Sequence, residues 1–156
     1  VGDSRCYLLR GDRLSQLTTD HTVAQKLVED GTLEPEEARA SRYNSVLWNA
    51  LGGGVSELQP QVIRATLRPA DTLVLCSDGL TAHVPDDRIR DILAEDRSAQ
   101  DASAELVRLA NEGGGQDNIT VVVARVGGDR VVKTPLEFSA VDTQTIEIPW
   151  STLAAG

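Results

Sequence analysis

The chain has 156 residues, of which 40% are hydrophobic and 25% are charged, the size and balance of one globular domain with a single core. Its 24 acidic and 15 basic residues give a net charge of -9, which argues against binding to nucleic acid or to an anionic membrane surface. No apolar run comes near the ~20 residues that cross a bilayer, which excludes a membrane-spanning helix from the sequence.

Cysteine usage and the start of the chain give two further expectations. Cys6 and Cys76 are the only cysteines, too few for a disulfide scaffold or a four-thiolate zinc site. No signal peptide is visible, which predicts a reducing, cytoplasmic location. Met is absent and the sequence begins at Val1, so we expect a part of a longer chain.

The first third of the chain predicts a hairpin followed by a charged, peripheral region. The run Arg-Cys-Tyr-Leu-Leu-Arg near the start and residues 13–18 have strand composition, and Gly11-Asp12 between them provides a turn. Asp20 is expected to cap one short helix, and Pro35 to begin another.

The middle of the chain predicts three more strands, at residues 45–51, 61–67 and 72–76. The glycine triplet that begins at Gly52 separates the first two. Only residues 72–76 form a strongly apolar run, which predicts a buried strand.

The last third predicts two amphipathic helices and one strand. Asp86 opens the first helix with an acid that favours its dipole, and Ser98 with Asp101 forms a capping-box pattern for the second. Residues 119–126 are β-branched nearly throughout and predict a central strand. Together the elements predict an α+β fold with helices on a largely antiparallel sheet, followed by a tail or linker at residues 127–156.

Three aspartates stand at the ends of predicted strands. Asp78 follows the apolar strand, Asp117 precedes the last strand and Asp3 precedes the first. If the apolar strand runs antiparallel to the other two, all three carboxylates gather at one edge of the sheet. Clustered carboxylates repel one another without a cation, and Mg²⁺ or Mn²⁺ prefers such oxygen ligands. For any single Asp-Gly or Asp-Asn, an ordinary turn residue is the more frequent explanation, so spacing alone does not establish a metal site.

Other catalytic systems find little support. There is no Gly-x-Ser-x-Gly turn, and the glycine triplets do not continue into Gly-Lys-Ser/Thr, which excludes a P-loop. His21 lies at a predicted helix cap and His83 in a loop before a helix, positions that need no catalytic explanation.

Three ordered motifs carry a family resemblance. They are Val-Gly-Asp-Ser-Arg at Val1, Leu-Cys-Ser-Asp-Gly-Leu at Leu75, and the stretch from Gly114 to Val123 that contains Gln-Asp-Asn. In this order they resemble the later motifs of the bacterial metal-dependent protein serine/threonine phosphatases, the phosphatase 2C family. The resemblance runs over residues 1–126, so it implies the carboxyl-terminal part of such a domain.

The resemblance implies a site as well. Asp78 and Asp117 match ligands of a centre of two Mn²⁺ or Mg²⁺ ions, and Asp3 matches the aspartate that helps hold a third ion. Three further residues match positions that orient the loops or carboxylates behind these ligands, namely Asn118, Ser4 and Gly79.

The same resemblance implies fold, activity and partners. The fold would be a layered, mostly antiparallel β-sheet sandwich flanked by helices, incomplete in this chain, with residues 20–54 as a flap beside the substrate groove. The activity would be hydrolysis of phosphoserine or phosphothreonine by a metal-activated water. The expected partners are phosphoproteins in signalling, together with a serine/threonine kinase and its targets.

One departure leaves alternatives. The family's Asp-Gly-x-Gly-Gly segment, which supplies a metal-bridging aspartate, has no match in these residues, and Asp78 with Asp117 alone does not make a two-ion site. A non-catalytic pseudophosphatase or regulatory binding module of the same fold is the alternative, and a truncated gene product without an independent fold is the third.

Overall fold

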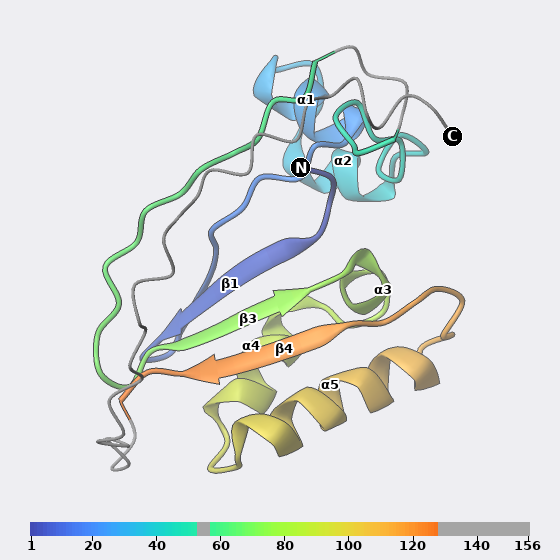
Figure 1. The fold of residues 1–156 in the computed structure, drawn as a ribbon. Coiled ribbons are helices and arrows are strands. Elements are labelled where there is room, and N and C mark those ends of the chain that lie inside the picture. Colours follow the sequence, from blue (N-terminus) through green and yellow to red (C-terminus); the bar gives the residue numbers. More distant parts are fainter. Residues whose placement is uncertain (53–56, 128–156) are drawn as a thin grey trace, which may run out of the picture.

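A computed structural model describes residues 1–52 and 57–127 (Figure 1). Figure 1 shows a sheet with helices on one side and a smaller helical region beyond one of its ends. The elements in chain order are β1 (Arg5–Arg10), β2 (Arg13–Gln16), α1 (Val23–Glu29), α2 (Pro35–Ala40), β3 (Thr72–Cys76), α3 (Asp78–Thr81), α4 (Asp86–Ala94), α5 (Ala99–Glu112) and β4 (Val121–Arg125).

The four strands form one antiparallel sheet in the order β2-β1-β3-β4, which confirms the predicted α+β class. Cys76 at the end of β3 pairs with Arg5 at the start of β1 and with Val121 at the start of β4. The carboxyl end of β3 therefore lies beside the amino ends of β1 and β4, the arrangement on which the metal-site hypothesis depends.

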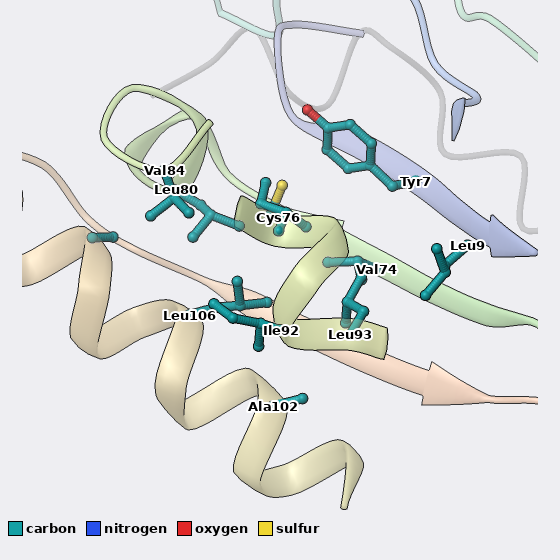
Figure 2. Packing of buried hydrophobic residues seen from close by; sticks show 12 residues of the cluster. Tyr7, Leu9, Val74, Cys76, Leu80, Val84, Ile92, Leu93, Ala102 and Leu106 are labelled. Carbon is teal, nitrogen blue, oxygen red and sulfur yellow. The ribbon is translucent and has the colours of Figure 1, made fainter. Parts of the chain in front are cut away.

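Helices α4 and α5 cover one face of this sheet, and the hydrophobic core lies between these helices and the sheet. Figure 2 shows Val74 and Cys76 of β3 facing Ile92 of α4 and Leu106 of α5. The core is aliphatic as the composition requires, with Tyr7 as its one aromatic member among the described residues. Each fully buried Leu or Ile side chain stabilises the fold by about 1.5–3 kcal/mol.

The opposite face of the sheet is apolar and partly open within the described residues. Side chains alternate between the two faces of a strand, so Leu75 points away from the side that Val74 and Cys76 occupy. Leu75 is 49% exposed and its register partner Val122 is 53% exposed. Covering this second apolar face would bury more apolar surface and would stabilise the fold further.

Two predicted strands are wrong. Residues 45–51 form turns and bends with a single bridge between Thr22 and Leu47. Residues 61–67 are exposed and lie outside every strand. That segment is attached through side chains, with Gln61 bonded to Thr19 and Arg10 to the carbonyl oxygen of Thr66, and a strand-like sequence forms no ladder without a backbone partner.

The last strand differs from its prediction in extent and in place. It begins at Val121 instead of residue 119, because the backbone of Thr120 bonds to Ser77 in the loop after β3. The prediction that it is central is wrong for the described sheet, where β4 is an edge strand and β1 and β3 are central. Val121 and Val123 of this strand pack against the helix-covered core, whereas Val122 lies on the opposite face.

The predicted helices are present, with one wrong cap. Thr22, and not Asp20, caps α1 by accepting a hydrogen bond from the amide of Gln25, because the Asp20 carboxylate binds Arg5. The capping of α5 by Ser98 is confirmed. The one-turn helix α3 was not predicted, and its first residue is Asp78.

The predicted flap at residues 20–54 and the predicted tail at residues 127–156 both extend beyond the described residues. Figure 1 places α1 and α2 together beyond the end of the sheet where β3 leads into α3, the region expected to be a flap. The tail from residue 128 lies outside the described residues. No helix in the described ranges is long and apolar enough to cross a membrane.

Candidate metal-binding edge of the sheet

The three predicted aspartates stand on segments that meet at one edge of the sheet. Asp78 begins α3, separated from β3 by Ser77 alone. Asp117 lies in the loop between α5 and β4, and Asp3 lies two residues before β1. The antiparallel pairing of β3 with both neighbours produces this convergence.

Ser77 joins the loop of Asp78 to the loop of Asp117. Its hydroxyl donates to the carbonyl oxygen of Asn118 and accepts from the amide of Thr120, both at 3.0 Å. Its own amide donates to the carbonyl oxygen of Thr120 at 3.1 Å. These bonds continue the β3–β4 ladder beyond the strands. This role of Ser77 could not be predicted from the sequence, because its partners are more than 40 residues away.

Gly79 allows the two loops to approach closely. A Cβ atom at this position would lie 2.5 Å from the carbonyl oxygen of Asn118, closer than real side chains come to backbone. Asn118 therefore contacts the Asp78 loop through its main chain. Ser4 is exposed, and its hydroxyl makes no hydrogen bond to another of the described residues.

The carboxylates themselves are only partly bound by protein. Asp78 accepts a hydrogen bond from the amide of Gly79 at 2.9 Å, and Asp117 from the amide of Asn118 at 2.7 Å. Partial burial, followed by the negative charge of Asp78, raises the pKa of Asp3 above its ordinary value. A cation between Asp3 and Asp78 would relieve both effects.

The edge fits part of a divalent-cation site. Carboxylate oxygens are the ligands that Mg²⁺ and Mn²⁺ prefer, and two of the three aspartate loops are held in contact. Within residues 1–52 and 57–127, however, no three His, Cys, Asp or Glu side chains are placed to hold one ion together. The described residues thus offer a partial ligand set.

Comparison with known proteins gives a consistent result. The chain is 44% identical over 126 residues to the serine/threonine protein phosphatase PstP of Mycobacterium tuberculosis, covering 81% of this chain and 24% of PstP. It is 42% identical over 123 residues to the protein phosphatase PhpP of Streptococcus pneumoniae, covering 79% of this chain and 50% of PhpP. No family model matches the chain.

Solved structures agree. A serine/threonine phosphatase of Streptococcus agalactiae matches with a TM-score of 0.76 and 34% identity, over 81% of this chain and 52% of that chain. The chain is homologous to one part of the bacterial phosphatase 2C family. The catalytic domain of PstP, solved in complex with two manganese ions, matches with a TM-score of 0.70 and 41% identity, over 81% of this chain and 52% of that one.

The chain spans about half the length of PhpP and of these solved phosphatase chains. The predicted resemblance to bacterial serine/threonine phosphatases and the phosphatase 2C type of fold are confirmed by this homology. A partial ligand set is consistent with a partial domain, because the likeness covers one half of each solved structure.

A buried polar contact that sequence reasoning missed connects the α1–α2 region of this chain to Asp3. Asn49 is 1% exposed, and its amide nitrogen lies 2.7 Å from Nδ1 of His21. Both residues hold Gly2 by its backbone: Gly2 donates to the carbonyl oxygen of Asn49, and His21 donates to that of Gly2, each at 2.9 Å. Gly2 has a φ of 85°, which a side chain would strain.

Proposed function

We propose that this chain forms part of a metal-dependent protein serine/threonine phosphatase and contributes Asp78, Asp117 and Asp3 to its Mn²⁺ or Mg²⁺ centre. The contact between the Asp78 and Asp117 loops, made by Ser77 and allowed by Gly79, carries the proposal. The similarity to PstP, whose catalytic domain was solved with two manganese ions, supports the choice of metal.

The residues of this chain would divide the work of such a centre. Asp78 and Asp117 would be ligands at the ends of two paired strands, and Asp3 would bind a further ion. Ser77, Gly79 and the backbone of Asn118 would fix the spacing of the ligand loops. When bound, the ions would activate water and neutralise charge on a phosphate group.

The substrates would be phosphoserine and phosphothreonine in proteins, in line with the names of the relatives. The partners would be phosphoproteins of a cytoplasmic signalling system and the kinase that modifies them. The partial ligand set in the described residues favours a second candidate, a pseudophosphatase or regulatory binding module that keeps the fold without turnover.

The test measures Mn²⁺-dependent hydrolysis of a phosphothreonine peptide by the full-length gene product. We expect Asp117→Asn and Asp78→Asn each to weaken Mn²⁺ binding and to remove most activity, because each loses a charged ligand. Asp12→Asn is the matched control, since Asp12 is exposed in the β1–β2 turn at the other end of the sheet. A folded wild-type protein that binds Mn²⁺ and hydrolyses no phosphopeptide would establish the pseudophosphatase instead.

A further inference from the structure

A polar cavity of about 570 Å³ lies beside the proposed metal edge. Thr81 and Ala82, within about one helical turn of Asp78, form part of its wall. Residues of α1 and α2, including Arg39, also line the cavity. A phosphorylated side chain at the metal edge would therefore have the neighbouring residues of its peptide close to this cavity.

Arg5, the first residue of β1, joins three walls of the cavity. Its Nε and Nη2 atoms donate to the Asp20 carboxylate at 3.0 and 2.7 Å. Its Nη1 atom donates to the Tyr7 hydroxyl at 2.8 Å, and that hydroxyl donates to Asp86 at 2.9 Å. Asp20 leads into α1 and Asp86 begins α4, so one guanidinium connects the sheet, the α1–α2 region and α4.

Three of the five N–H donors of Arg5 bind protein partners. Its Nε–Nη2 edge, the one that would bind a phosphate with two parallel hydrogen bonds, is occupied by the Asp20 carboxylate. Asp20 is held from a second side by Gln16 at 2.9 Å, and its side chain is only 11% exposed. The geometry suits a fixed support of the cavity and not a ligand of the substrate.

We propose that Arg5 and Asp20 are positioning residues that hold the α1–α2 wall of the cavity in place for the peptide chain flanking a phosphorylated residue. The proposal rests on the proposed phosphatase function. It assigns to this pair a role in substrate recognition that is separate from the metal ligands.

The experiment compares two substrates of the full-length gene product, a phosphothreonine peptide and p-nitrophenyl phosphate, which is too small to reach both places. Arg5→Lys keeps the positive charge and loses the bidentate hydrogen bonding to Asp20. Asp20→Asn keeps a hydrogen-bond acceptor and loses the negative charge. Hydrogen bonds to charged groups contribute enough to expect the peptide-to-ester ratio of kcat/KM to fall on the order of tenfold in each variant. The double variant should fall no further than either single one, because the two residues act as one unit.

Arg108→Lys is the matched control. Arg108 makes a similar two-sided contact with Glu105 on the exposed face of α5, so its substitution should leave the ratio unchanged. An unchanged ratio in folded Arg5→Lys and Asp20→Asn, or an additive loss in the double variant, would overturn the proposal. Absence of Mn²⁺-dependent ester hydrolysis in the wild type would instead reject the phosphatase function itself.

Discussion

Replacing Ser77 by Ala tests whether its hydroxyl holds the two aspartate loops together. The substitution removes the donor to the carbonyl oxygen of Asn118 and the acceptor for the amide of Thr120, both at 3.0 Å, and leaves the backbone bond from Ser77 to Thr120 in place. A neutral hydrogen bond contributes about 0.5–1.5 kcal/mol net, and these two are solvent-exposed. We therefore expect a loss of roughly 1–2 kcal/mol in the free energy of unfolding.

The assay is urea unfolding of the full-length gene product, followed by Mn²⁺ titration of the folded variant. Ser103→Ala is the control, because the Ser103 hydroxyl donates to the carbonyl oxygen of Gln100 within α5. That bond is local, and Ala is a better helix former than Ser by up to roughly 0.5 kcal/mol, so the control should be neutral or slightly stabilising. Ser77→Ala should also weaken Mn²⁺ binding, since the distance between Asp78 and Asp117 is then less restricted. Equal stability and equal Mn²⁺ affinity of the two variants would refute the reasoning.

Three further substitutions give separate tests. Gly79→Ala places a Cβ 2.5 Å from the Asn118 carbonyl oxygen, so we expect a loss of about 1–3 kcal/mol in urea unfolding and weaker Mn²⁺ binding; unchanged values would show that the loops move apart freely. Asp3 has a raised pKa, so the stability that its protonated form contributes is present below its ordinary pKa and lost as pH rises through the raised value. At pH 7 without metal, the melting temperature of Asp3→Asn should therefore be no lower than that of wild type. Added Mn²⁺ should raise the melting temperature of Asp3→Asn less than that of wild type. The guanidinium of Arg10 lowers the pKa of Asp71 from 3.8 to about 2, so its stabilisation is present above pH 3.8 and lost as pH falls through about 2; the urea midpoints of wild type and Asp71→Asn should converge over that range, and a constant difference would contradict this.

The elements that the sequence predicted correctly are those whose signals are local. The β1–β2 hairpin follows from a turn pair between two strand-like runs, and α5 follows from a cap at Ser98 and an apolar face. Such signals lie within one element, so no knowledge of the rest of the fold is needed to interpret them.

The wrong predictions concern residues whose behaviour depends on distant partners. Asp20 could have capped α1, but Arg5, 15 residues away, binds its carboxylate in a part-buried site. Residues 61–67 have strand composition, but among the described residues only side chains hold them. Strand propensity describes a fit to a pleated surface, and the surface itself is not visible in the sequence.

The proposed site shows the same division. The positions of Asp3, Asp78 and Asp117 at strand ends were visible in the sequence, and the antiparallel topology brings their segments together. The bridge made by Ser77 and the hold of Asn49 on Gly2 were not visible, because both join residues more than 40 positions apart.

The open face of the sheet adjoins the edge at which the three aspartates stand. A shallow hollow of about 410 Å³ runs over this face, and its lining includes Ser4 and Ser77 at the aspartate edge together with Leu75 and Val122. A segment packed against this face would bury Leu75 and Val122 and would end beside the loops of Asp78 and Asp117. If that segment also carried the remaining metal ligands, burial of the sheet face and completion of the ligand set would occur together, and metal binding would be coupled to stability.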